Sequence, residues 1–228
     1  REGVPYPRAH FETGIASHAC LQAVGEETNR ADRELAAHEV EAVARATCAA
    51  LISAGRTFDG HPEPPLAPDN VWPGRDLALN WLAFHPLQPG AQYEVGLAVD
   101  ADWKPVEYRS KSARLRAIVD DLRLHDEGDD ESTWSAVTLQ DAKSAWSTDE
   151  SELETQQLRS HAVLAWRHFP DRDVIRRRVA NLRTHRIFGD SFEHELHLAS
   201  EEDRAKLARW RDDLTSTMDA YDDMERVG

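Results

Sequence analysis

Prolines are the feature that most restricts how this chain can fold. Each proline lacks the backbone N–H that a helix interior needs, and its ring blocks the preceding helical turn. Five of them lie close together, at Pro62, Pro64, Pro65, Pro68 and Pro73. Residues 56–74 are therefore predicted to form an extended connector. It would separate an N-terminal helical segment, residues 1–55, from an α+β core, residues 75–228, within what we expect to be one domain.

Apolar residues recur every three or four positions in several segments, which is the spacing of an amphipathic helix. The clearest stripe lies between residues 29 and 54 and ends at Gly55, a residue type that commonly terminates helices. About six helices are predicted, over residues 10–24, 29–54, 112–123, 147–169, 171–186 and 200–221.

Strand-like alternation of apolar and polar residues occurs in the middle of the chain. This alternation predicts a small antiparallel β-meander around residues 76–110, with strands at 77–83, 93–99 and 106–109. Leu82 and Phe84 interrupt the alternation of the first segment, so residues 77–84 could instead be helical. A further short strand is predicted at 134–139. The expected fold class is α+β and predominantly helical.

The charge balance is strongly acidic. The chain has 42 acidic and 27 basic side chains, which give a formal net charge of −15. The averaged field therefore repels phosphate backbones and anionic lipids. Non-specific coating of nucleic acid and binding to a membrane surface are not expected.

Six arginines between residues 172 and 186 stand out against this acidic background. The predicted helix 171–186 would carry apolar residues on one side and a cationic face on another. Clustered guanidinium groups suit carboxylates or phosphates. Two interpretations follow: an ion-pair network with acids of this chain or of a partner, or a contact with RNA or DNA. The candidate binding arginines are Arg172, Arg176, Arg183 and Arg186.

Arg178 and His185 have a spacing that a ribonuclease family also uses. Seven residues apart, they would share one face of a helix. This Arg-x6-His spacing is similar to the loose Arg-x(4–6)-His pattern of HEPN-type ribonucleases, although Val179 follows the arginine where that family typically has Asn or Asp. The resemblance covers two residues and implies a metal-independent cut of RNA, with His185 as acid or base. Otherwise the two are a solvated arginine and a surface histidine.

The stretch Glu193-His-Glu-Leu-His197 offers two imidazoles and two carboxylates, so His194 and His197 are candidate metal ligands. They would share a face on a helix and point to opposite faces on a strand. The sequence has no Glu-x-x-His pair and no His-Glu-x-x-His motif, so ordinary polar histidines are the preferred interpretation and no cofactor is expected. Nucleophile-elbow, phosphate-loop and dinucleotide-binding motifs are also missing from the sequence.

Several tryptophans fall in predicted loops or at the ends of predicted elements, where an indole can anchor a partner. They are Trp72, Trp103, Trp134 and Trp146, of which we single out Trp72 and Trp103 as candidate binding residues. Cys20 and Cys48 fall in apolar helical patterns and are expected to be reduced and buried. The alternative is a single disulfide between them.

A cytoplasmic location is expected, because the sequence has neither a signal-peptide layout nor a long apolar run. Without a catalytic motif, a non-enzymatic role is favoured over an enzymatic one. The expected function is that of an interaction or accessory protein, such as an assembly or immunity-type subunit, bound to a protein partner or to further copies of itself. The alternative is nucleic-acid binding or RNA processing through residues 172–186.

Overall fold

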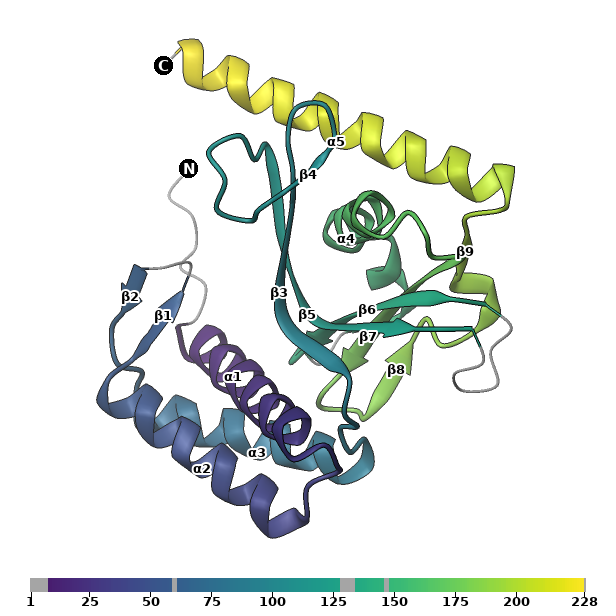
Figure 1. Cartoon of the computed structure of the whole chain (residues 1–228). Coiled ribbons are helices and arrows are strands. Elements are labelled where there is room, and N and C mark those ends of the chain that lie inside the picture. The colour runs from purple at the N-terminus through teal and green to yellow at the C-terminus, as the bar shows by residue number, and fades with distance from the viewer. Residues whose placement is uncertain (1–7, 59–60, 128–133, 146–147, 228) are drawn as a thin grey trace. The chain divides into compact units, whose positions relative to one another are not determined.

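The computed structural model describes residues 8–58, 61–127, 134–145 and 148–227 (Figure 1). The chain forms two compact units. Unit 1 contains residues 1–93, 142–148 and 180–186, and unit 2 contains residues 94–141, 149–179 and 187–228. The fold class is α+β, as predicted. In the described part of the chain it comprises five α-helices and a mixed sheet of seven strands.

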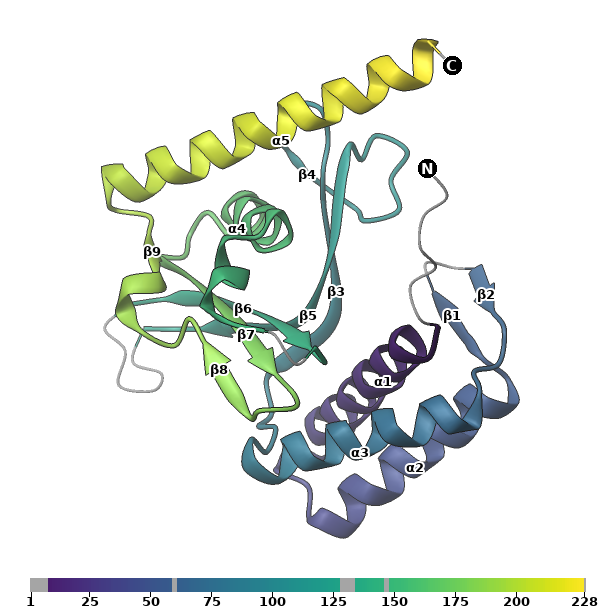
Figure 2. The ribbon, with the colours of Figure 1, turned by 180° about the vertical axis from the view of Figure 1, so that it is seen from behind.

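Unit 1 is built on three helices, α1 (Arg8–Ala31), α2 (Ala37–Ser53) and α3 (Pro68–Phe84) (Figures 1 and 2). A short antiparallel hairpin of β1 (Arg56–Phe58) and β2 (His61–Glu63) connects α2 to α3. Small side chains such as Ala16, Cys20 and Ala44 fill much of the core between the helices. The helices can therefore pack closely.

Gly74 marks the closest approach of α3 to α1. A Cβ atom there would lie 2.5 Å from the carbonyl oxygen of Thr13 and 2.6 Å from the Cβ of Ala16. No larger residue fits this position without moving a helix, because real Cβ contacts are longer. The start of α3 is fixed by Glu12 of α1, whose carboxylate accepts hydrogen bonds from the Ala67 amide (3.2 Å) and the Asn70 side chain (2.7 Å).

The predicted connector over residues 56–74 differs from the observed structure. Among the described residues of this segment, only 64–67 lack regular secondary structure, because the hairpin precedes them and α3 begins at Pro68. A proline at the first helical position needs no hydrogen bond from its missing N–H. The prediction of a strand at 77–83 is wrong, and the helical alternative for residues 77–84 is confirmed.

Unit 2 contains most of the sheet, whose strand order is β4-β3-β5-β6-β7-β8, with β9 paired to β7. The register pairs Ala98 with Val106, Leu122 with Leu139 and Ile175 with Leu196. The strands are β3 (Ala91–Val99), β4 (Pro105–Val106), β5 (Leu115–His125), β6 (Ala136–Lys143), β7 (Val174–Asn181), β8 (Arg186–Phe188) and β9 (Leu196–His197).

Strands β6 and β7 run in the same direction, because the Asp173 amide bonds to Ser135 at one end and the Leu182 amide to Lys143 at the other. Helix α4 (Gln156–His168) connects them after a 3-10 turn at Glu150–Glu154, and a second such turn spans Phe192–His194. Helix α4 packs on the sheet, and α5 (Glu201–Val227) lies on the other side of α4 (Figure 2).

Two predicted helices are strands, and this changes the small meander into a large mixed sheet. Residues 112–123 contribute to β5, and residues 171–186 form β7, a turn and the start of β8. Strand β7 is buried on two faces along most of its length, and β5 is so near its centre, as adjacent Asp121 and Leu122 illustrate. A strand buried on both faces loses the alternation of apolar and polar residues, so its apolar residues can mimic helical spacing.

The predicted strands at 93–99 and 134–139 are confirmed in β3 and, from residue 136 on, in β6. The strand predicted at 106–109 is wrong beyond Val106, because β4 ends there and residues 108–109 form a turn. No helix over the described residues is both long and apolar enough to cross a membrane.

Candidate functional site

Strand β7 places its three consecutive arginines on two sides of the sheet, because successive side chains of a strand point to opposite faces. Arg177 shares its side with Ile175, which packs against α4 and α5. Arg176 and Arg178 lie on the opposite side, which we call the arginine face. Residues 171–186 were predicted to present one cationic face of a helix. Their arginines on β7 instead lie on two different sides of the sheet.

Carboxylates of unit 2 pair with both arginines of the arginine face. Arg176 Nε lies 2.7 Å from Glu195 Oε1, and Arg178 Nη2 lies 2.5 Å from Asp190 Oδ1. Just before β7, Arg172 Nη1 contacts Asp126 Oδ1 at 2.6 Å. An ion-pair network of these arginines with acids of the same chain was one interpretation of the sequence, and Asp126 begins an acidic stretch at residues 126–131. Asp126 is such a partner, and residues 128–131 lie outside the described part of the chain.

Asp121 of β5 adds a buried carboxyl group near these cations. It is 7% exposed, and its two oxygens lie 3.4 Å from Nε and Nη2 of Arg123. Burial raises the pKa of Asp121, although the charges of Arg123 and Arg178 act in the opposite direction. This carboxyl group therefore binds its proton more tightly than an ordinary aspartic acid does.

Arg177 is the most unusual of the arginines, because it is 1% exposed. Its Nη1 donates a 2.6 Å hydrogen bond to the carbonyl oxygen of Leu153, and its guanidinium lies 4.8 Å from the centre of the Trp210 ring. Arg159 and Lys206 also lie over that ring, at 5.6 and 4.9 Å. Three cations therefore surround one indole, which suits the negative face of an aromatic ring.

Glu154 is the carboxylate that these three cations share. Its oxygens lie 3.3 Å from Arg159, 3.4 Å from Arg177 and 3.6 Å from Lys206. Burial opposes ionisation of Glu154, but Arg177 and Lys206 outweigh it and hold the pKa of this carboxyl group below its usual range. Burial also lowers the pKa of Arg177, against the opposing charge of Glu154. The cluster joins β7, α4 and α5.

Arg183, His185 and Arg186 belong to unit 1 and lie in the turn after β7 and at the start of β8. Arg183 Nε donates a 2.5 Å hydrogen bond to the carbonyl oxygen of Ser144. His185 has a positive φ of 54° and its ring lies 4.5 Å from that of Phe84. Arg186 is exposed. Because no helix runs from Arg178 to His185, the shared helical face expected from the ribonuclease-like spacing does not exist.

The two candidate metal ligands His194 and His197 lie in different elements, a 3-10 turn and β9. His194 Nε2 is 2.7 Å from Glu150 Oε1, whereas His197 Nε2 is 3.3 Å from Glu195 Oε2. Each imidazole therefore has a carboxylate neighbour of its own. The two histidines therefore do not lie on one face of a helix, which is the arrangement that would have placed both near one metal ion.

The tryptophans differ in exposure. Trp72 and Trp103, the two predicted anchors, are half-buried: Arg75 lies 4.9 Å from the ring of Trp72, and Trp103 packs against the core of unit 2. Trp134 is 44% exposed and makes an edge contact with the His197 ring at 6.1 Å between centroids. Trp146 lies outside the described residues. Trp134 is thus a better candidate for an accessible indole than either predicted anchor.

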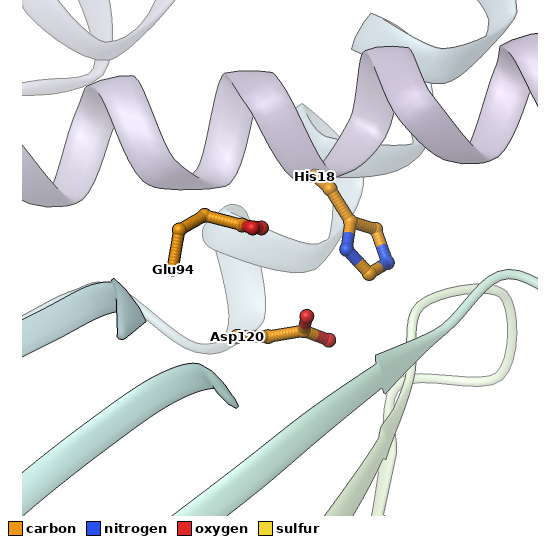
Figure 3. A group of neighbouring side chains, drawn as sticks. All are labelled: His18, Glu94 and Asp120. Carbon is orange, nitrogen blue, oxygen red and sulfur yellow. The ribbon is translucent and has the colours of Figure 1, made fainter. Parts of the chain in front are cut away.

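Two half-buried carboxylates lie on neighbouring strands, Glu94 on β3 and Asp120 on β5, with oxygens within 4.8 Å of each other (Figure 3). Acidic groups this close are common in proteins without a bound ion, so the pair by itself does not indicate a metal site. His18, also labelled in Figure 3, belongs to unit 1, where its Nε2 lies 2.8 Å from the carbonyl oxygen of Ala142.

The thiols of Cys20 and Cys48 are free and buried, and their sulfur atoms lie 3.6 Å apart. Burial raises the pKa of both, and the neighbouring thiol raises that of Cys20 further. Both are therefore protonated and packed between α1 and α2 rather than poised as nucleophiles.

The chain matches no family model, and neither the curated proteins nor the solved structures gave a match. Sequence reasoning missed Arg177, Asp121 and the Trp210 cluster. For Arg177 the signal was the β-branched content of Val174, Ile175 and Val179, which favours a strand and hence places Arg177 on the same side as Ile175.

Proposed function

We propose that this chain is a non-enzymatic interaction protein, an accessory subunit that binds a protein partner. The observation that carries this proposal is the pairing of arginines in the segment 172–178 with carboxylates of the same unit. Arg172, Arg176 and Arg178 each contact a carboxylate of the same unit. Such pairs make the arginine segment part of the scaffold, so the binding surface is better sought elsewhere.

The surface that best suits a partner lies where β5 ends and β6 begins, and we call it the hairpin-end surface. It contains the exposed side chain of Trp134, at 44%, and the charged pair of Arg172 with Asp126, which the hydrogen bonds between Ser135 and Asp173 hold close to it. An apolar centre with a charged rim is the usual composition of a protein interface, and tryptophan is the residue type most enriched among its energetic centres.

The backbone beside Trp134 is held firmly. Ser135 donates from its amide and its hydroxyl to Asp173 Oδ2, at 3.1 and 2.7 Å, and its carbonyl accepts from the Asp173 amide at 2.9 Å. An anchor that is ordered before binding loses less conformational freedom when the partner docks. This supports Trp134 as a preorganised contact.

The alternative, nucleic-acid binding or RNA processing through residues 172–186, has weaker support. Binding phosphates with Arg176 or Arg178 would first require separating them from Glu195 and Asp190. The net charge of −15 adds a repulsive field around any such contact. Arg183 and Arg186 remain the candidates on which this alternative rests.

The proposal is tested by capture of partners from the native lysate, followed by size-exclusion chromatography with light scattering. We expect the wild-type chain to retain a defined partner, or a second copy of itself, in fixed stoichiometry. Trp134→Ala should lose that species. Phe11→Ala removes another exposed aromatic side chain, in unit 1, and should retain it.

A wild-type chain that elutes as a monomer and retains no stoichiometric partner would overturn the proposal. So would a complex that survives Trp134→Ala unchanged.

A further inference from the structure

Unit 1 contains a pocket of about 360 Å³ at the end of its three-helix bundle where α1 and α3 terminate and α2 begins. This volume lies near the lower limit of small-molecule sites in proteins. The lining residues are Val24, Thr28, Glu34, Leu35, Ala37, Val40, Glu41, Leu79, Leu82, Ala83, Pro86 and Leu87. All of them belong to unit 1.

The interior of the pocket is apolar. Val24, Leu35, Leu82 and Leu87 are buried, and each is 8% exposed or less. At the solvent side the exposed lining residues include the small Ala37 and Ala83, which leave the entrance open, together with Glu34, Glu41 and Pro86. A hydrocarbon or aromatic group that entered would remove apolar surface from water, at about 25 cal/mol for each Å² buried.

Two hydrogen-bonded links preform the walls. The Asn29 side chain donates to the carbonyl oxygen of Ala91 at 2.6 Å and accepts from the Gly90 amide at 2.8 Å, which ties the end of α1 to the start of β3. Gln88 donates to Glu34 Oε2 at 2.8 Å, and this bond links the segment after α3 to the turn before α2. The pocket therefore does not depend on a ligand to hold its shape.

Charge at the entrance favours a cation. The lining includes the carboxylates of Glu34 and Glu41 and no lysine, arginine or histidine. Two helix C-termini and one N-terminus meet there, so their partial charges sum to negative. Arg45 already neutralises Glu41 at 2.6 Å, whereas the Glu34 carboxylate bonds to the neutral amide of Gln88. Glu34 is therefore the carboxylate better placed to receive a ligand's charge.

We propose that this pocket binds a small organic cation with an apolar body, an aliphatic or aromatic amine. The apolar body lies among Val24, Leu35 and Leu82, and the ammonium group lies at Glu34. The proposal concerns unit 1 and is independent of the protein partner proposed for unit 2.

The test uses two probes of matched chain length, octylammonium and octanoate, titrated into the whole chain by calorimetry at low salt. We expect saturable 1:1 binding of octylammonium, about fivefold tighter than octanoate, as a single solvent-screened charge pair allows. Glu34→Gln should remove this preference. Glu26→Gln neutralises an exposed carboxylate of α1 outside the pocket and should leave it intact.

Ala83→Phe fills the entrance from an exposed helical position, so it should abolish the binding of both probes without unfolding the chain. The proposal is overturned if the wild-type chain does not bind octylammonium saturably, or if it binds octanoate as tightly. Binding that persists unchanged in Ala83→Phe overturns it as well.

Discussion

Among the arginines of β7, Arg177 is the one whose truncation should lower the free energy of unfolding most. Truncation to alanine removes the hydrogen bond to Leu153, the contact with Trp210 and one of the three cations around Glu154. We expect Arg177→Ala to lower the free energy of unfolding by about 3 kcal/mol, since it combines a cavity with a lost charge-assisted hydrogen bond. Urea denaturation measures this loss.

The matched control is Arg209→Ala on the exposed side of α5, which should change the free energy of unfolding by no more than about 0.5 kcal/mol. Equal effects of the two substitutions would show that the buried arginine contributes nothing beyond an ordinary surface residue.

Asp121 should give the chain a pH dependence opposite in sign to that of most acids. Burial raises its pKa in the folded state, so the folded chain binds more protons than the unfolded chain between the ordinary aspartate pKa and the raised one. Stability contributed by this group is present at low pH and is lost as pH rises through that window. Asp121→Asn removes the titration.

We therefore expect the stability of Asp121→Asn minus that of wild type to increase as pH rises from about 4 toward neutral. Urea unfolding of both chains at several pH values measures this difference. The other carboxylates contribute equally to both chains, so their contributions to the pH dependence cancel. A difference that stays constant or decreases with pH would contradict the raised pKa.

At this residue scale, sequence reasoning anticipated the chemistry better than the geometry. The expectation that arginines near residue 172 pair with acids of the same chain agrees with the contacts of Arg172 to Asp126 and Arg177 to Glu154. Their arrangement was not predictable, because it depends on which side of β7 each arginine occupies. That in turn depends on recognising the strand.

Among the elements, helices α1, α2 and α5 were expected in the correct part of the chain, with other bounds, whereas the interior strands β5 and β7 were predicted as helices. Helices α1, α2 and α5 expose one face, so their sequences retain the periodicity of 3.6 residues. Strand β7 and the centre of β5 are covered on both faces, and Ile118-Val119 or Val174-Ile175 fit a helical stripe equally well. The proline-rich segment misled in another way, since Pro68 begins α3 instead of delaying it.

The contact of α1 with α3 gives a test at the scale of elements. Gly74→Ala would place a Cβ within 2.6 Å of Thr13 and Ala16 atoms, so α3 must shift away from α1. We expect a loss of about 1–3 kcal/mol in unfolding free energy, the usual cost of overpacking a core. Thermal or urea denaturation followed by circular dichroism reports it.

Gly14→Ala is the matched control, because its Cβ would meet only the Ser144 hydroxyl oxygen at 3.5 Å. Alanine is a better helix former than glycine, so this substitution should leave stability unchanged or raise it. A Gly74→Ala chain as stable as Gly14→Ala would contradict the close packing of the two helices.

For the whole molecule, the acidic charge and the paired arginines predict weak affinity for nucleic acid. We expect no saturable binding of single-stranded RNA or duplex DNA at about 50 mM salt, where phosphate contacts are strongest. Fluorescence anisotropy with labelled oligonucleotides measures this. Salt-sensitive binding that is lost when Arg183 and Arg186 become glutamate would instead support the nucleic-acid alternative.

The fold class was predictable at this scale, because composition and turn signals separate α+β chains from other classes. The extent of the sheet was not, since β6 and β7 are brought together only through the crossover by α4. The hairpin-end surface was visible in sequence as Trp134, but its exposure depends on where β6 begins.

The most direct test of the proposed function is the affinity of the captured partner for wild type and for Trp134→Ala, measured by calorimetry with both purified components. If Trp134 anchors the interface, we expect the variant to bind at least tenfold more weakly, as loss of a central aromatic contact typically causes. Phe11→Ala should bind like wild type. Affinities of wild type and Trp134→Ala within twofold of each other would contradict the proposed binding surface.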